Sequence, residues 1–425
     1  MILWEDIMKT FTRALCGAVS MIAVTAAVPA VADPKAEVLH YWTSGGEAKA
    51  VQALQEAFSA RGGEWVDAPV AGGGGDAQAA VLRARVLAGD PPAAVQIKGP
   101  NIQEWAEAGA LGDLTAVAAA QEWDKVLPEA IQNIVKYEGK YVAVPVNVHR
   151  VDWIWANPEV LAKVGAEVPT TWDEFNETAD KLLAAGIIPL AHGRQPWQDA
   201  TVFETVVLGI GGTDFYRKAL VELDMDALGS DTMVQVFDQM RKMRGYVDPD
   251  FPGRDWNLAT AMVMRGEAAM QIMGDWAKGE FAAAGKVPGV DYVCASTPSD
   301  NGYLLNSDSF AMFNVSGDDN VEGQAVLAEL ILGTEFQETF NLFKGSIPAR
   351  TDVPRTEFDD CAIKSMDDMV AAAEGGTLLG SMAHEIAQAG AVRGAFIDVA
   401  TAHFNSDMSS QDAVAQLVDA IKLAQ

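Results

Sequence analysis

Residues 266–276 read Gly-Glu-Ala-Ala-Met-Gln-Ile-Met-Gly-Asp-Trp. Residues 268–273 are mostly apolar, no helix-capping pattern precedes them, and Gly274 ends the run, which together predict a short buried strand. Trp276 comes soon after that glycine. Its indole can either close a core between two domains or lie at the mouth of a cleft. Other aromatic and isolated charged side chains at the ends of similar strands favour the cleft.

Strands and helices alternate in the first part of the chain. The pattern predicts strands over residues 37–42, 64–70 and 93–97, each followed by a helix. This order is typical of a mainly parallel sheet with helices on its faces, and such sheets bind ligands beyond the carboxyl ends of their strands. Tyr41, Trp42 and Lys98 fall at two of those ends.

The alternation resumes further along the chain, beginning with a capping box at Thr171. Pro145 interrupts the apolar run 141–148, which favours a sheet edge or a crossing between domains. Residues 344–350 resemble a return crossing. We therefore expect an α/β fold of two lobes. The first lobe would take residues 33–144 and 303–343, and the second would take residues 145–302 and 344–425.

The beginning of the sequence has the features of an export signal. Lys9 and Arg13 precede an apolar run over residues 14–28, and Ala30-Val31-Ala32 is a small-x-small cleavage site. We expect residues 1–32 to be a signal peptide that is removed on export, with either Met1 or Met8 as the start. The run is too short to span a bilayer.

The cysteines and the net charge limit the possible partners. Cys294 and Cys361 follow the signal, and an even pair in an oxidising compartment suggests one disulfide, although two separate thiols are also possible. The formal net charge of -29 argues against nucleic acids and anionic membrane surfaces as partners. No acidic run is long enough to be a docking tail.

Three common kinds of site are not predicted. The glycines of residues 72–75 lack the Lys-Ser or Lys-Thr of a phosphate loop, so a backbone turn close to a cleft is expected there. The histidines show no metal-ligand spacing, and no Gly-x-Ser-x-Gly elbow is present. The sequence therefore predicts no metal, no cofactor and no hydrolase of the elbow type.

Tryptophans at predicted strand ends and loops point to a carbohydrate ligand. A sugar has apolar C–H faces and a rim of hydroxyls, so its site needs flat rings above and below and charged groups at the edge. The chain supplies such rings at Trp42, Trp153, Trp155, Trp197, Trp256 and Trp276.

Several motifs together resemble the extracellular solute-binding proteins of ABC sugar importers, and most closely the periplasmic glucose-binding proteins. The resemblance covers nearly all of the chain after the signal. It rests on Tyr41-Trp42 with Glu47, and on residues 70–75, 96–99, 141–150, 195–200, 273–276, 307–309 and 344–350. It implies a type II periplasmic binding fold with the ligand between the lobes, a monomer, and a membrane permease as partner.

The resemblance also implies roles for particular residues. Trp42 and Trp276 would stack on a monosaccharide, glucose first and galactose next, with Tyr41 beside them where relatives can have a second tryptophan. The hydroxyls of the sugar would be bound by Glu47, Gln96, Lys98, Asp308, Lys344 and His384. Trp153 and Trp256 are weaker candidates, for the core or the pocket wall.

Two alternatives of other classes stay open at this point. A secreted carbohydrate-active enzyme could use Glu47 and Asp308 as its paired carboxylates. A binder of another small solute, such as a polyamine or an amino acid, would keep the fold and change the ligand. The first predicts turnover of a glycoside, and the second predicts no response to monosaccharides.

Overall fold

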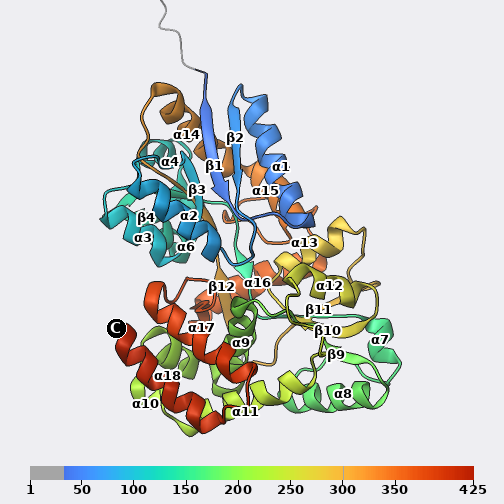
Figure 1. Cartoon of the computed structure of the whole chain (residues 1–425). Coiled ribbons are helices and arrows are strands. Elements are labelled where there is room, and N and C mark those ends of the chain that lie inside the picture. Colours follow the sequence, from blue (N-terminus) through green and yellow to red (C-terminus); the bar gives the residue numbers. More distant parts are fainter. Residues whose placement is uncertain (1–32, 300) are drawn as a thin grey trace, which may run out of the picture. The chain divides into compact units, whose positions relative to one another are not determined.

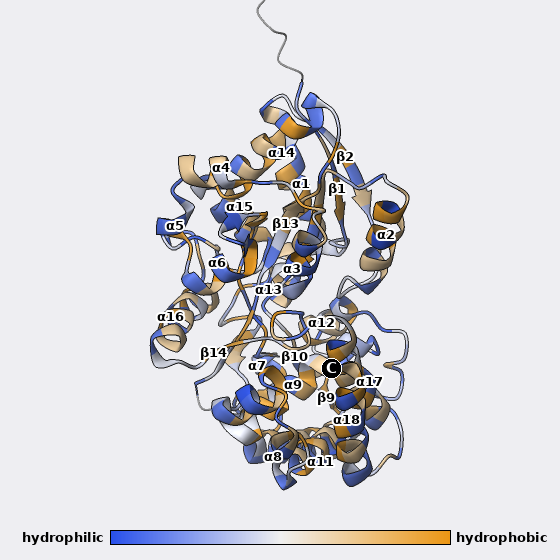
Figure 2. Cartoon of the chain, turned by 90° about the vertical axis from the view of Figure 1, so that its left-hand side faces the viewer, coloured by the Kyte–Doolittle hydropathy of each residue, from blue (hydrophilic) through white to orange (hydrophobic). Residues whose placement is uncertain are grey.

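The computed structural model describes residues 33–299 and 301–425, and in it the chain forms two α/β lobes (Figure 1). The predicted fold class is confirmed. The expected signal peptide and both candidate start residues lie outside the described residues. Polar and apolar residues are interspersed along most helices, as expected for helices that cover a sheet (Figure 2). None of the helices in the described ranges is long and apolar enough to cross a membrane.

The first lobe is organised around a five-stranded sheet in the order β2-β1-β3-β13-β6. β1 pairs in parallel with β2 and β3, and β13 runs antiparallel to both of its neighbours. The strands are β1 (Lys35–His40), β2 (Glu64–Pro69), β3 (Ala94–Lys98), β6 (Ala143–Pro145) and β13 (Asp308–Met312). The helices of this part are α1 (Gly45–Ala60), α2 (Asp76–Leu87), α3 (Pro100–Glu107), α4 (Thr115–Ala120), α5 (Trp123–Val126), α6 (Glu129–Val135), α14 (Asp318–Ile331) and α15 (Thr334–Lys344).

The second lobe contains a four-stranded sheet in the order β11-β8-β10-β9. Its strands are β8 (Trp153–Ala156), β9 (Ile188–Leu190), β10 (Ala268–Ile272) and β11 (Val293–Ser296). Its helices are α7 (Pro158–Ala162), α8 (Trp172–Ala184), α9 (Pro196–Tyr216), the π-helix η1 (Arg217–Val221), α10 (Met225–Leu228), α11 (Asp231–Gly245), α12 (Trp256–Met264), α13 (Trp276–Ala283), α17 (Gly390–Phe404) and α18 (Ser410–Ala424).

The strand predicted at residues 268–273 is confirmed as β10. All five of its residues are buried, because β8 and β9 pair with its two edges and helices cover its faces. Trp276 is the first residue of α13, so the short turn after β10 places its indole at the end of the sheet.

Short strands connect the two lobes. β7 (His149–Arg150), β12 (Tyr303–Asn306) and β14 (Leu378–Gly380) form a third sheet in the order β14-β12-β7, next to α16 (Asp360–Gly375). A two-stranded hairpin, β4 (Lys136–Tyr137) and β5 (Lys140–Tyr141), completes the strands. Side chains between residues 347 and 372 pack in the core of the first lobe, although the expected division assigns residues 344–425 to the second. The lobe boundaries therefore remain a prediction.

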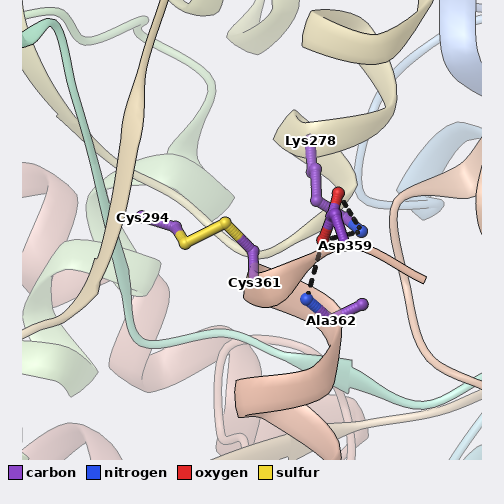
Figure 3. Close-up of a disulfide and its surroundings, with 5 residues drawn as sticks. All are labelled: Lys278, Cys294, Asp359, Cys361 and Ala362. Atoms are coloured by element: carbon purple, nitrogen blue, oxygen red, sulfur yellow. Dashed lines mark hydrogen bonds and ion pairs between the residues drawn. A yellow bond between two sulfur atoms is a disulfide. The ribbon is translucent and has the colours of Figure 1, made fainter. Parts of the chain in front are cut away.

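The predicted disulfide is present between Cys294 on β11 and Cys361 on α16, with a Cα–Cα distance of 6.1 Å (Figure 3). Beside it, Lys278 Nζ lies 3.0 and 3.1 Å from the two carboxylate oxygens of Asp359, and the Asp359 carboxylate accepts a hydrogen bond from the Ala362 N–H. The disulfide and the ion pair attach the beginning of α16 to β11 and α13.

Candidate functional site

A cavity of about 350 Å³ lies where residues following β1 and β10 meet the crossing from β12 to β13. Seven of the nine predicted ligand-binding residues line it: Tyr41, Trp42, Glu47, Trp276, Asp308, Lys344 and His384. The other two, Gln96 and Lys98, line a second cavity of about 390 Å³, which shares Tyr41 with the first. The convergence of side chains so far apart in the sequence makes the first cavity the candidate site.

Four indoles line this cavity: Trp42, Trp197, Trp256 and Trp276. The Trp42 ring is fixed from behind by Phe310 and Phe340, at centroid distances of 5.7 and 5.4 Å. The Trp276 ring lies 4.8 Å from that of His384 and 6.3 Å from that of Trp197. Rings held by such neighbours lose little side-chain entropy when a ligand stacks on them.

The glycine run of residues 72–75 packs against these rings. A Cβ on Gly74 would lie 2.9 Å from Trp197 Cδ1, and one on Gly75 would lie 2.9 Å from the Tyr41 ring. Both glycines have positive φ, of 85° and 93°. Only glycine permits this backbone path and this close approach together, so the run forms part of the cavity wall.

Asp308 is the centre of a buried hydrogen-bond network at the base of the cavity. Its Oδ1 accepts from Gln96 Nε2 at 3.1 Å and from the Tyr41 hydroxyl at 3.4 Å, and its Oδ2 accepts from Asn147 Nδ2 at 3.1 Å. Burial by itself would raise the pKa of Asp308, but the hydrogen bond and charge of His149 and the charge of Lys98 hold it well below its usual range. The carboxylate is therefore ionised.

His149 connects this network to the second lobe. Its Nε2 lies 3.2 Å from Asp308 Oδ2, and its Nδ1 is hydrogen-bonded to Asp275 Oδ1. Burial would lower the pKa of His149, but the charge of Asp275 and the two hydrogen bonds to carboxylates raise it above its usual value. The His149 side chain therefore joins Asp308 on β13 to Asp275 in the turn after β10.

Each charged group beside the cavity has an opposite partner. Lys344 Nζ lies 3.1 Å from Glu47 Oε1 and 5.5 Å from the centre of the Trp42 ring. Lys98 Nζ lies 3.6 Å from Glu385 Oε2, and its side chain is 3% exposed. The Lys344–Glu47 pair joins α15 to α1 within the first lobe, so it is held in place before a ligand arrives. This lowers the cost of arranging a charged donor and acceptor around the ligand.

His384 is held by the second lobe. The Thr201 hydroxyl donates to the Trp197 carbonyl at 2.8 Å, so it accepts from His384 Nε2 at 2.9 Å. Burial and the positive charges of Lys98 and Arg393 hold the pKa of His384 well below its usual value. The ring is therefore neutral, with a proton on Nε2, and Nδ1 is a hydrogen-bond acceptor.

The loop that carries His384 rests on a buried carboxylate. Glu204 accepts hydrogen bonds from the Ser381 hydroxyl at 2.6 Å, the Met382 N–H at 2.7 Å and the Tyr216 hydroxyl at 2.9 Å. Burial raises the pKa of Glu204 to about 7, although these hydrogen bonds act in the opposite direction. The donors converge on Glu204 and fix the loop, and with it the position of His384.

Comparison with known proteins places the chain in a family. Residues 42–330 match the family described as bacterial extracellular solute-binding protein. A "Probable sugar-binding periplasmic protein" of Brucella melitensis is 54% identical over 91% of this chain and 92% of its own length. A protein of the same description from Rhizobium meliloti is 51% identical over 98% of this chain and 100% of its own. The chain belongs to the bacterial extracellular solute-binding proteins.

Solved structures of solute-binding proteins share this fold. A chitin oligosaccharide binding protein superposes with a TM-score of 0.77 at 17% identity, covering 92% of this chain and 98% of that one. The bacterial solute receptor AcbH gives a TM-score of 0.77 at 18% identity, covering 92% and 99%. At this level of identity the likeness concerns the fold.

Membership of this family of binding proteins excludes the enzyme alternative for Glu47 and Asp308. The chemistry of the two carboxylates agrees. A glycoside hydrolase needs one carboxylic acid that stays protonated, with a raised pKa. Asp308 has a lowered pKa, and Glu47 is engaged by Lys344 and by the Ser44 hydroxyl at 3.0 Å. Glu47 and Asp308 are therefore suited to accept hydrogen bonds from a bound solute.

The structure also adds residues to the site that the sequence analysis did not assign to it. His149 and Asn306 line the cavity from the crossing strands. Gly73 lines it from the glycine run, where a turn close to a cleft was expected. His149 lies within the motif 141–150, and Asn306 precedes the motif 307–309. Their position next to those motifs is the one signal that pointed to them. Trp197 and Trp256 belong to the wall, as their place at predicted loops suggested.

Proposed function

We propose that this solute-binding protein captures a monosaccharide, glucose or galactose, in the cavity between its lobes and delivers it to the membrane permease of an ABC importer. The observation that carries the proposal is the composition of the cavity wall. Four indoles surround a space bordered by Glu47, Asp308, Lys344 and the neutral His384. Flat rings suit the C–H faces of a pyranose, and the charged and polar groups suit its hydroxyls.

The names of related proteins support a sugar as the ligand. The two relatives described above carry sugar-binding names, and a glucose-binding protein of Saccharolobus solfataricus is 26% identical over 48% of this chain. These relatives favour a sugar over a polyamine or an amino acid.

Contacts across the cleft support capture by closure. The Gly46 N–H on α1 donates to Glu280 Oε1 on α13 at 2.8 Å, and Arg393 Nη1 on α17 lies 3.0 Å from Asp76 Oδ1 on α2. A ligand can contact Trp42 on one lobe and Trp276 on the other at the same time only when the lobes have closed. Binding then shifts the population towards the closed form, and the permease recognises that form.

Isothermal titration against a panel of monosaccharides tests the proposal. We expect one site per chain, a dissociation constant in the micromolar range or tighter, equivalent to about 8 kcal/mol or more, and a change in tryptophan fluorescence. The sugar should be recovered unchanged. Absence of heat and of any fluorescence response with every monosaccharide would contradict the proposal and direct the search to another small solute. Sedimentation of the same sample tests the proposed monomer.

A further inference from the structure

Asn306, the last residue of β12, has a buried amide without a hydrogen-bond partner. Its side chain lines the candidate cavity, the residue is 3% exposed, and Oδ1 is buried and unbonded. No hydrogen bond joins its Nδ2 to any residue of the ranges 33–299 and 301–425 either. Burying such a group unpaired costs about 1–3 kcal/mol, so an unpaired amide at this place needs an explanation.

A second asparagine at the same crossing shows the contrast. Asn147 Nδ2 donates to Asp308 Oδ2 at 3.1 Å, and Asn147 Oδ1 accepts from the Asp308 N–H at 2.9 Å. Its amide is used at both ends to join the segment after β6 to β13. The backbone of Asn306 on β12 pairs with that of His149 on β7, but the side-chain amide of Asn306 takes no part in this pairing. The Asn147 amide therefore joins the strands of the crossing, whereas the Asn306 amide can bind a ligand.

The neighbours of Asn306 do not offer it a partner because their own polar atoms are committed. His149 is engaged on both ring nitrogens, by Asp275 and Asp308. Asp308 already accepts from Gln96, Tyr41, Asn147 and His149. What remains to satisfy the amide is the contents of the cavity.

We propose that Asn306 hydrogen-bonds a hydroxyl of the bound sugar and is a specificity-determining residue of the site. The inference rests on the proposed function. An amide presents both a donor and an acceptor, as a sugar hydroxyl does, so a hydroxyl can pair with whichever amide atom faces the cavity. A site built around such a group discriminates strongly against an analogue that lacks the hydroxyl, because the amide then stays buried and unpaired.

The test combines Asn306→Ala with deoxy analogues of the hexose that the wild-type protein binds. The variant should bind the parent hexose about 10- to 100-fold more weakly. Each analogue lacks one hydroxyl. With one of these analogues the wild-type protein should lose about as much affinity as Asn306→Ala loses with the parent hexose. With that same analogue, Asn306→Ala should bind little more weakly than the wild type does. This pattern identifies the hydroxyl that Asn306 contacts, and a merely structural role would not produce it.

Two comparisons keep the outcome interpretable. Because its amide has no protein partner, Asn306→Ala should melt, without sugar, at a temperature equal to or above that of the wild type. Asn133→Ala, at an exposed position on α6 away from both cavities, should bind as the wild type does. Equal losses with every deoxy analogue, or an unchanged affinity for the parent hexose, would overturn the inference. If the wild-type protein binds no monosaccharide, the proposed function itself fails.

Discussion

Arg393 on α17 forms an ion pair with Asp76, the first residue of α2, with Nη1 and Oδ1 3.0 Å apart. The two partners differ in environment, because the Arg393 side chain is 8% exposed and that of Asp76 is 66% exposed. Arg393 also donates from Nε to the Ala383 carbonyl at 2.9 Å, next to His384. The pair therefore connects the loop that carries His384 to the helix that follows the glycine run of the other lobe.

Asp76→Asn should weaken sugar binding, because the closed form loses a contact that the open form lacks. An ion pair with one exposed partner is worth about 0.2–1 kcal/mol, so the dissociation constant should rise by about 1.4- to 5-fold. Raising the salt concentration should reduce the difference from the wild type. Asp90→Asn is the control, since Asp90 pairs with Arg85 within the first lobe. Equal effects of the two variants would contradict a role in closure.

Trp276→Ala should weaken binding by about 2 kcal/mol or more, because the indole is a large aromatic surface between His384 and Trp197. Titration calorimetry measures the loss, and circular dichroism of the unliganded variant checks that the fold remains. Trp276→Phe keeps a flat ring and should lose less. A loss under about 0.5 kcal/mol for the alanine variant would remove Trp276 from the stacking surface.

How far the sequence predicted the site depended on the kind of strand. β10 could be predicted because Gly274 ends a mostly apolar run. Tyr41 and Trp42 could be assigned to the site because they lie at the end of a clearly predicted strand. Gln96 and Lys98 lie two residues apart on β3, so their side chains share one face. All five residues of β3 are buried, so no alternation of polar and apolar residues reveals which cavity that face lines.

The residues of the crossing strands were harder to predict. β7 has two residues and β12 has four, which is too short for a periodic pattern. His149 acquires its role from Asp275 and Asp308, 126 and 159 positions away in the sequence. Nothing local marks such a residue as part of a site, because tertiary contacts create its electrostatic role.

His403 should make the protein less stable in acid. Burial and the positive charge of Arg241 lower the pKa of His403 to about 4, and both ring nitrogens are buried without a partner. In the unfolded chain the pKa is about 6.5. As the pH falls from 6.5 to 4, the unfolded chain takes up a proton and the folded protein does not, so stability falls across this window.

His403→Phe should remove this part of the acid sensitivity. The ring packs 4.8 Å from that of Phe237, so an apolar ring of similar size suits the site. Denaturant unfolding at several pH values between 7 and 4 gives the difference in free energy between variant and wild type. This difference should grow in favour of the variant by up to ~3 kcal/mol as the pH falls. If the free energies of unfolding of variant and wild type changed in parallel with pH, His403 would not titrate as described.

The Cys294–Cys361 disulfide should stabilise the fold, because it closes a loop of 67 residues. Chain-entropy arguments give about 4 kcal/mol for such a loop, within the usual range of about 0–5. The double variant Cys294→Ser, Cys361→Ser should therefore unfold at a lower denaturant concentration. The wild type in reductant should approach the variant, and a variant as stable as the oxidised wild type would contradict this expectation.

Gly99 tests lobe closure most directly, because the backbone of the second lobe lies against it. A Cβ on Gly99 would lie 1.7 Å from the Glu385 carbonyl oxygen, on the loop that carries His384. No rotamer change relieves a clash with backbone, so Gly99→Ala should keep the lobes apart. We expect a loss of affinity of about 100-fold or more, equivalent to ~2.7 kcal/mol, and no compaction in small-angle scattering at high sugar concentration.

Gly109→Ala is the control for the effect of a Cβ at a positive-φ glycine. Gly99 and Gly109 have φ of 48° and 69°. The ψ of Gly99 is -138°, outside the left-handed helical region, so alanine costs more backbone energy there. A Cβ on Gly109 meets nothing within 4 Å. Thermal unfolding without sugar measures how far each variant is destabilised, and among variants that remain folded Gly99→Ala alone should lose sugar binding. Wild-type affinity in Gly99→Ala would show that sugar is held without the contact between Gly99 and Glu385.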